Sequence, residues 1–432
     1  MEKLRIIGVC VTSIHQLEIQ RMLIQLSVQA EKRGYHLQIF APFCDFYHHS
    51  PSDRGERHIF EFIPYEDLDG LIIFNALIKD ETISKELADR GKEQGIPVIS
   101  VKAPIEGCCN IRYDVTIALQ EMICHLIEKH HCQNIHFMAG LAGNNISEER
   151  IQIYKTTLEN YHQEVVDSHI HYGDFWFGPT IAATEKILAA EEPLPDAIVC
   201  ANDAMALAVC DCLAKHQISV PNDIIVTGLG AILERNYHFP LLSTAIYDPV
   251  LSGRYIFDAM EQIMAGTLAP DSEVVIPCTN EYTESCGCVI HDEHDSDKRL
   301  NSLFTVLEQE RGYCHATHEF TSFLNRDCKI KNFANLFPNY IQEPGIYACN
   351  LYLTTAYGKA VGLPFESSTE DTAMILLDHV QEEIRDIPIK AMSMTEMLHN
   401  DRKLYAPGKQ ILLIPLNSQE EFYGILSIQY DG

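Results

Sequence analysis

Residues 196–216 read DAIVCANDAMALAVCDCLAKH, and this stretch decides the fold class. Its first part, Asp196–Cys200, is a short apolar run of the kind that forms a strand buried on both faces. Its second part, Asp203–His216, spaces apolar residues as a helix does, and Asn202 is a typical residue for a helix N-cap. A buried strand followed directly by a helix is the building unit of a parallel α/β sheet.

The same alternation extends over about the first 280 residues. Further strands are predicted at Arg5–Thr12, Tyr35–Ala41, Gly70–Phe74, Pro97–Val101, Asn134–Ala139, Ser168–Tyr172 and Asp223–Thr227. Helices are predicted at Gln16–Arg33, Lys79–Gln94, Thr116–His131, Ser147–Tyr161 and Thr180–Ala190. These strands are too many for one doubly wound sheet, so we expect two α/β lobes. A ligand would then bind in a crevice at the carboxyl ends of the strands.

Composition excludes several classes of function. The 432 residues contain 32 Lys and Arg against 61 Asp and Glu, a formal net charge of −29. Direct binding to nucleic acid needs a basic face, so we expect none. No apolar run approaches the roughly 18 to 20 residues that span a bilayer, so we expect no membrane insertion. The 15 cysteines are odd in number and scattered, which favours reduced thiols in the cytoplasm.

The pattern changes after about residue 288. Leu300, Leu303, Phe304 and Leu307 recur at helical spacing, which predicts a helix that either pairs with its copy in a homodimer or packs on its own domain. Strands are then predicted at Tyr347–Thr355, Ile411–Leu416 and Phe422–Gln429, the last two as an antiparallel hairpin. We therefore expect three parts: a two-lobed domain at 1–290, a helical linker at 291–325 and a smaller α+β domain at 326–432.

Local motifs along the first part resemble a known family. In order, they are Arg33-Gly34-Tyr35, Asp69-Gly70-Leu71-Ile72, Gly95-Ile96-Pro97-Val98, Ser147 with Arg150 and Tyr154, Ala201-Asn202-Asp203, Val220-Pro221-Asn222-Asp223-Ile224 and Ser285-Cys286-Gly287. Together they resemble the effector-binding core of LacI-type regulators, which has the type I periplasmic-binding-protein fold. The family's helix-turn-helix would precede the first strand, and we do not expect it in this chain.

The resemblance also implies a set of ligand-binding residues. Arg150 would hold a polar or anionic group through its guanidinium. Asp203 and Asn202 would accept hydrogen bonds from hydroxyl groups, or act only as helix caps. The remaining candidates are Phe175 and Trp176 as an aromatic wall or as packing residues, and Asp114 and His15 as residues facing the ligand.

One position departs from the family pattern. Relatives that bind sugars carry an aspartate after the last strand of this lobe, whereas this chain has Gly228-Leu229-Gly230-Ala231. A ring hydroxyl would lose its acceptor there, so we expect a small polar ligand other than a standard sugar.

The last part resembles a GAF domain. Leu413-Ile414-Pro415-Leu416 followed by Tyr423-Gly424-Ile425-Leu426-Ser427-Ile428 is similar to that family's terminal hairpin. The family's final helix does not follow before Gly432, so we expect a truncated domain. The whole arrangement resembles the input half of diguanylate cyclases, which implies a catalytic GGDEF domain beyond residue 432.

Metal or enzyme chemistry has one candidate. Cys286, Cys288, His291 and His294 form Cys-x-Cys-x2-His-x2-His, four residues of the types that bind zinc. The spacing is tighter than that of typical zinc fingers, and the family's domain ending already accounts for Cys286. We therefore predict no cofactor and no metal, and keep this cluster as the alternative.

The sequence leads to one main functional hypothesis and two alternatives. The main hypothesis is a cytoplasmic ligand sensor, not itself an enzyme, whose closure is relayed through the helix and the GAF-like part to a diguanylate cyclase. The first alternative is a transcriptional regulator or corepressor that reaches DNA through a partner carrying a helix-turn-helix. The second is an enzyme that uses a metal at the Cys/His cluster.

Overall fold

The chain folds into two compact units in a computed structural model. Unit 1 comprises Met1–Arg112, Pro249–Val275 and Gly312–Gly432, and unit 2 comprises Tyr113–Asp248 and Ile276–Arg311. The structure describes residues 4–289, 297–308, 311, 346–354, 373–375, 379–380, 383–384, 391–392 and 409–431.

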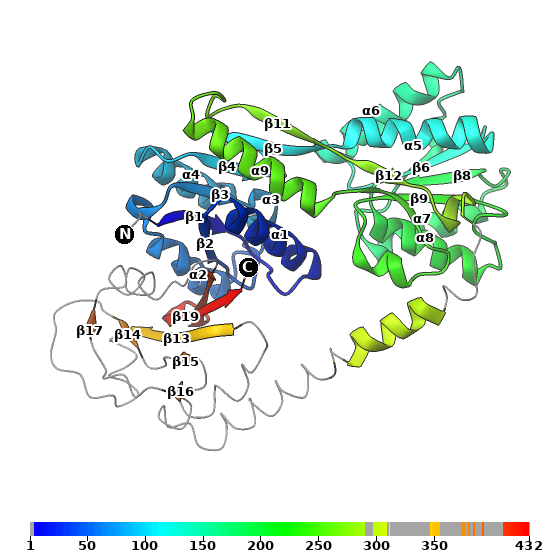
Figure 1. Cartoon of the computed structure of the whole chain (residues 1–432). Coiled ribbons are helices and arrows are strands. Elements are labelled where there is room, and N and C mark those ends of the chain that lie inside the picture. Colours follow the sequence, from blue (N-terminus) through cyan, green and yellow to red (C-terminus); the bar gives the residue numbers. More distant parts are fainter. Residues whose placement is uncertain are drawn as a thin grey trace. The chain divides into compact units, whose positions relative to one another are not determined.

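Unit 1 is built on an 11-stranded sheet in the order β11-β5-β4-β3-β1-β2-β18-β19-β13-β14-β17 (Figure 1). Its first strands are β1 (Arg5–Cys10), β2 (Tyr35–Phe40), β3 (Gly70–Ile73), β4 (Val98–Val101), β5 (Cys109–Asp114) and β11 (Glu273–Pro277). Strands β2, β1, β3, β4 and β5 run parallel to one another. Ile7, Leu37 and Ile39 are 0% exposed, as expected of strands covered on both faces.

The helices of unit 1 follow the strands in sequence. They are α1 (Leu17–Lys32), α2 (Pro51–Arg57), α3 (Asn75–Ile78), α4 (Glu81–Glu93) and α9 (Pro249–Met264), with 3-10 turns at His58–Phe62 and Tyr65–Asp67. Helices α1 and α9 lie side by side (Figure 1). Arg33, just after α1, pairs with Asp258 and Glu261 of α9, each at 2.7 Å.

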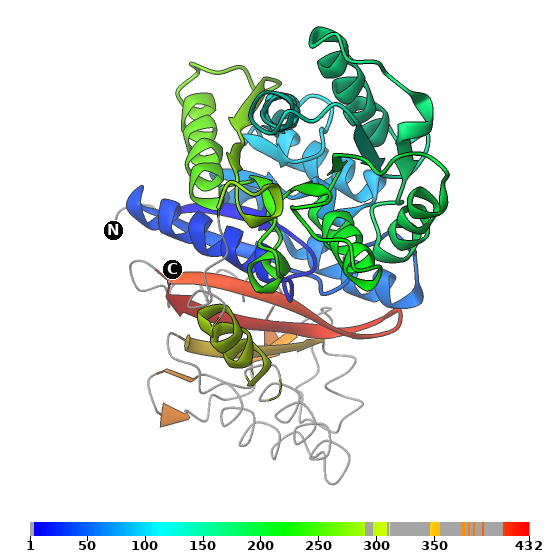
Figure 2. The ribbon, with the colours of Figure 1, turned by 90° about the vertical axis from the view of Figure 1, so that its right-hand side faces the viewer.

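The C-terminal strands extend the sheet of unit 1. They are β13 (Ile346–Thr354), β14 (Ala373–Ile375), β17 (Ala391–Met392), β18 (Lys409–Ser418) and β19 (Glu421–Asp431), with a separate pair, β15 (His379–Val380) and β16 (Glu383–Ile384). Figure 2 shows β18 and β19 as two long red strands running side by side, and this antiparallel hairpin confirms the sequence prediction. Strand β18 also pairs in parallel with β2, with Ile411 opposite Gln38. The domain boundaries and the GAF resemblance stay predictions.

Helix α2 packs tightly on the turn between β18 and β19. The Asn417 side chain donates a hydrogen bond to the Ser52 carbonyl at 3.3 Å, and Arg54 pairs with Glu420. A Cβ atom added at Gly55 would lie 2.0 Å from the backbone oxygen of Gln419. Only glycine therefore fits where the helix meets the turn.

We predict that Gly55→Ala destabilises the protein by about 1–3 kcal/mol, because the new methyl group overpacks against backbone. Gly178→Ala is the matched control: it also lies in a helix, and nothing lies within 4 Å of the added carbon. The control should leave the stability unchanged or raise it by up to about 1 kcal/mol. Urea denaturation measures both, and equal effects of the two substitutions would contradict the close packing.

Unit 2 contains a 6-stranded sheet in the order β12-β10-β9-β8-β6-β7. Its strands are β6 (Ile135–Ala139), β7 (Ile170–Tyr172), β8 (Ala197–Cys200), β9 (Ile225–Leu229), β10 (Ser243–Ile246) and β12 (Thr279–Glu281), all parallel except β12. Its helices are α5 (Val115–His130), α6 (Asn145–Asn160), α7 (Phe177–Ala189) and α8 (Asp203–Lys215), with 3-10 turns at Asp167–His169, Leu233–Tyr237 and Glu284–Cys286. The two sheets confirm the predicted α/β class.

A helix occupies residues 297–308, within the predicted linker. Leu300, Phe304 and Leu307 are 43%, 63% and 47% exposed, so most of its apolar stripe faces solvent. Arg299, near the start of this helix, forms an ion pair with the buried Glu284. The other predicted linker residues lie outside the described residues, except residue 311. None of the helices in the described residues is both long enough and apolar enough to cross a membrane.

Candidate functional site

Most of the predicted ligand residues lie along the carboxyl edge of the unit 2 sheet. Phe175 and Trp176 follow β7, and Asn202 and Asp203 follow β8. Arg150 reaches the same edge from α6, because it contacts Phe175 and the Ala201 carbonyl that precedes Asn202. This is the edge at which parallel α/β sheets bind ligands.

Arg150 joins two of these loops. One guanidinium nitrogen donates a hydrogen bond to the Ala201 carbonyl, and the guanidinium carbon lies 5.9 Å from the centre of the Phe175 ring. Within the part of the chain that the structure describes, the other N–H groups of Arg150 have no hydrogen-bond partner. The side chain is partly buried and carries donors that a carboxylate or phosphate group could accept from.

The Phe175 ring packs against the backbone of Gly140, a residue that no sequence motif marks. A Cβ atom added at Gly140 would lie 2.0 Å from the ring, so the ring lies directly over that backbone. The Asn202 amide donates to the Phe175 carbonyl at 3.3 Å, and Phe175 has a positive φ of 58°. Trp176 is 66% exposed and touches Phe177 edge-on, with ring centres 6.2 Å apart.

Asn202 and Asp203 both make structural contacts. The Asn202 side chain accepts from the Met205 amide at 2.8 Å, so it is the N-cap of α8. Asp203 is 0% exposed; one carboxylate oxygen accepts from the Thr244 hydroxyl at 2.5 Å and the other from the Ile232 amide at 3.0 Å. Both oxygens of Asp203 are therefore engaged inside unit 2, and its contact with a ligand stays a prediction.

Burial sets the protonation of Asp203. Loss of solvent raises its pKa to about 6, although the hydrogen bonds from Thr244 and Ile232 and the charge of Arg235 favour the ionised form. The folded protein therefore holds a proton on this group more strongly than an unfolded chain does. This proton contributes stability below about pH 4, and the contribution is lost as the pH rises to 6.

We predict that the stability difference between the wild type and Asp203→Asn depends on pH, because asparagine cannot ionise. The wild type should lose up to about 3 kcal/mol relative to the variant between pH 4 and pH 6, the equivalent of a shift of about two pKa units. Urea denaturation of both proteins across this range measures the difference. A difference that is flat with pH would contradict the raised pKa.

Asp114 and His15 complete the predicted set. Asp114 caps α5, accepting from the Ile117 amide at 3.1 Å. Burial raises the pKa of Cys278 to about 12, with the charge of Asp114 adding to this effect and that of Arg150 opposing it. His15 is exposed and belongs to unit 1, between β1 and α1.

An aromatic pair also belongs to this edge and was not predicted. Tyr247 directly follows β10, and its ring centre lies 4.6 Å from that of Tyr113. Burial raises the pKa of the Tyr247 hydroxyl, which the Arg150 charge partly opposes. No signal in the sequence marks this pair, because Tyr247 and Tyr113 belong to none of the motifs.

Two residues of the predicted Cys/His cluster lie beside histidines that the prediction did not include. Cys286 and Cys288 lie near each other, but the histidines beside them are His125 and His130 of α5. His291 and His294 lie outside the described residues.

The comparisons with known proteins support the fold. Residues 123–286 match the family model described as a periplasmic binding protein-like domain. Among solved structures, the Lac repressor dimer bound to operator and the anti-inducer ONPF superposes with a TM-score of 0.52 at 18% identity, covering 66% of this chain and 94% of that one. Residues 123–286 are therefore similar to a periplasmic binding protein-like domain, and the described part of the chain shares its fold with the Lac repressor structure.

Several of the similar curated proteins are named as transcriptional repressors. Catabolite control protein A of Priestia megaterium is 27% identical over 243 residues, 55% of this chain and 71% of that protein. The protein of Bacillus subtilis named "Probable HTH-type transcriptional repressor ExuR" is 28% identical over 178 residues, 41% of this chain. The chain spans about half the length of that second relative, 52%.

These findings correct one sequence-based hypothesis and leave another without support. The main functional hypothesis, a sensor that relays to a diguanylate cyclase, is wrong: the similar proteins are transcriptional repressors, which favours the first alternative. The prediction of no direct contact with nucleic acid gains no support, because one similar structure is bound to its operator.

Proposed function

We propose that this protein is a ligand-responsive regulator of transcription that works in the cytoplasm as a homodimer. Its similarity to repressors along the effector domain supports this function. The net charge of −29 supports contact with DNA through a partner that carries a basic DNA-binding surface. The apolar stripe on the helix at 297–308 supports a paired chain.

Arg150 is the observation that carries the proposal of a ligand. Its guanidinium stands at the carboxyl edge of a parallel sheet, between the Phe175 ring and the β8 loop, and most of its N–H donors have no partner in the described residues. A planar fork of donors beside an aromatic ring suits a small molecule with both a ring and a carboxylate or phosphate group. Ala231 offers no carboxylate for a neutral sugar, which also favours an anionic ligand.

We predict that an anionic probe raises the melting temperature of the full chain more than a neutral sugar does. Galacturonate, glucose 6-phosphate and ribose are suitable probes for differential scanning fluorimetry. Arg150→Ala should weaken binding of the anionic probe by about 10- to 100-fold, the value of a hydrogen bond to a charged group.

Lys155→Ala is the matched control for this experiment. It removes a positive charge from the same helix, where Lys155 pairs with Asp167 at 2.8 Å. This variant should bind the probe as the wild type does. Equal loss in both variants would show a general charge effect, and no response to any of the three probes would reject this class of ligand.

Contact with DNA through a partner has its own test. The full chain, purified from the cells in which it naturally occurs, should co-purify with a protein that contains a helix-turn-helix. In a gel-shift assay, only the mixture of the two proteins should retard operator DNA. Salt-sensitive binding to DNA by the purified chain alone would contradict a partner-mediated mechanism.

A further inference from the structure

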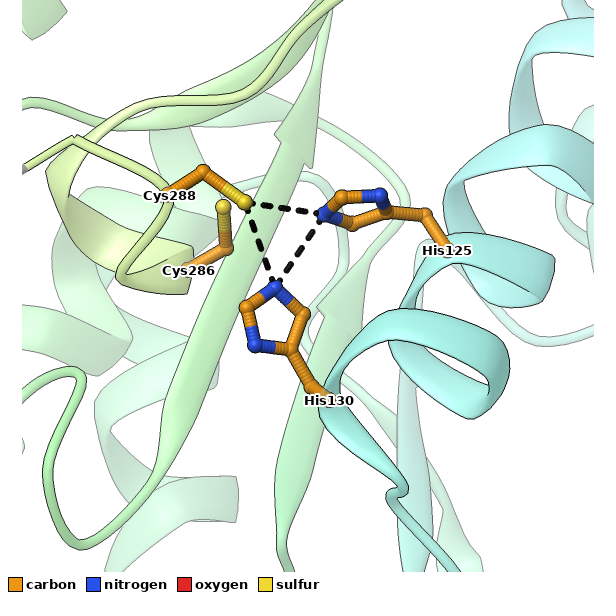
Figure 3. A group of neighbouring side chains, drawn as sticks. All are labelled: His125, His130, Cys286 and Cys288. Carbon is orange, nitrogen blue, oxygen red and sulfur yellow. Dashed lines mark hydrogen bonds between the residues drawn. The ribbon is translucent and has the colours of Figure 1, made fainter.

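Four zinc-ligand side chains converge at one end of helix α5. The Nε2 atoms of His125 and His130 lie 3.1 Å apart, and the Cys288 sulfur lies 3.2 Å from the first and 3.4 Å from the second (Figure 3). The Cys286 sulfur belongs to the same group, in which all four ligand atoms lie within 4.8 Å of one another. Two imidazole nitrogens and two sulfurs therefore surround one point.

Hydrogen bonding alone does not account for this arrangement. A neutral imidazole nitrogen either donates one proton or offers one lone pair, and it does not do both. Each of the two Nε2 atoms nevertheless has two close polar neighbours, the other Nε2 and the Cys288 sulfur. A central cation would use one lone pair from each atom, so it satisfies all of them at once.

We propose that His125, His130, Cys286 and Cys288 bind one structural Zn²⁺ ion. Zinc–nitrogen bonds of about 2.0–2.1 Å and zinc–sulfur bonds of about 2.3 Å place tetrahedral ligand atoms roughly 3.3–3.8 Å apart. The three distances above are within a few tenths of an ångström of this range. A set of two sulfurs and two imidazoles selects zinc over the oxygen-preferring Mg²⁺ and Ca²⁺.

The fold fixes the backbone around these side chains. His125 and His130 lie in the last two turns of α5, and the Tyr282 ring stacks on His125 with ring centres 3.7 Å apart. Cys286 ends a 3-10 turn and is 1% exposed. Gly287 has a φ of 79°, which lets the chain turn sharply enough to bring Cys288 back to the histidines.

The turn that carries the cysteines is itself anchored to the sheet. The Ser285 hydroxyl donates to the Val226 carbonyl at 2.6 Å and accepts from the Ser243 amide at 2.8 Å. The backbone of the four proposed ligand residues would therefore move little when the ion binds. Binding would release the two thiol protons to solvent and form two zinc–thiolate bonds and two zinc–imidazole bonds.

Four protein ligands leave no open position for a substrate, so the ion would have a structural role. It would join α5 to the turn that carries Cys286 and Cys288. The site is independent of the ligand residues at the carboxyl edge, so it can fail without affecting the proposed function.

The test uses the full chain, purified under reducing conditions without a histidine tag. Metal analysis should find about one zinc ion per chain. After removal of the zinc, added Co²⁺ should produce the visible bands of a tetrahedral site and a thiolate-to-cobalt absorption in the near ultraviolet. Cys288→Ser removes one of two thiolates, so it should roughly halve the near-ultraviolet absorption.

The substitutions His130→Ala and Cys288→Ser should each weaken zinc binding by more than about 100-fold, since even residues that only support metal ligands are worth 10- to 100-fold. The matched control is His131→Asn: His131 is the next residue, is exposed and has a positive φ of 58° that asparagine tolerates. This variant should bind zinc as the wild type does.

Two results would overturn the proposal. The first is a folded wild-type chain that retains no zinc and gives no cobalt spectrum. The second is a chain that binds zinc equally well with and without His130 and Cys288, which would place the ion elsewhere. Circular dichroism of each variant shows that it is folded, and Cys288 is exposed, so its substitution by serine should not disturb the core.

Discussion

The carboxyl edge of unit 2 depends on one buried carboxylate. Asp203 starts helix α8, yet its oxygens bind Thr244 on β10 and Ile232 in the loop after β9. It thus fixes the start of α8, the loop after β9 and strand β10 relative to one another. Gly228 makes room for it, since a Cβ atom there would lie 2.2 Å from an Asp203 oxygen. Removing the group would leave buried donors without partners, which costs more than a surface hydrogen bond.

The residues that stabilise this edge of the sheet differ from those proposed to bind the ligand. Asp203 is buried and Asn202 caps α8, whereas Arg150, Phe175 and Trp176 make fewer structural contacts and are the ligand residues on which the proposal rests. Arg150 is itself positioned by the Ala201 carbonyl, one residue before that cap. A short Ala-Asn-Asp sequence therefore orients the charged group that the proposed ligand would meet.

The α/β class and most strands of the two sheets could be predicted from the sequence, because buried parallel strands are continuous apolar runs. Helix α2 could not: it has seven residues, and its start depends on a capping box between Ser50 and Asp53 rather than on an apolar stripe. The terminal hairpin was predicted, but its pairing with β2 was not, since hydrophobic pattern does not say which distant strand lies alongside.

Only part of the candidate site could be predicted, because a sequence pattern does not show which distant residues contact each other. Motif residues such as Arg150 and Asn202 were found, whereas Gly140 and Tyr247 carry no motif and matter only through what they touch. The cysteines of the proposed zinc site were noticed, but His125 and His130 were not, since sequence proximity pointed only to His291 and His294. His130 lies 158 residues before Cys288, a separation that no local spacing rule spans.

The parallel pairing of β18 with β2 has a consequence for how the protein is made. Leu37 of β2 is hydrogen-bonded to Gln410 of β18, 373 residues later in the chain. During synthesis β2 leaves the ribosome long before β18 exists, so its unpaired backbone groups form an open sheet edge for most of that time. In sequence, unit 2 comes between β2 and β18, and all strands described for it end before residue 282. Unit 2 can therefore assemble its described sheet before β18 has been made, whereas the described sheet of unit 1 is completed only when β18 and β19 follow.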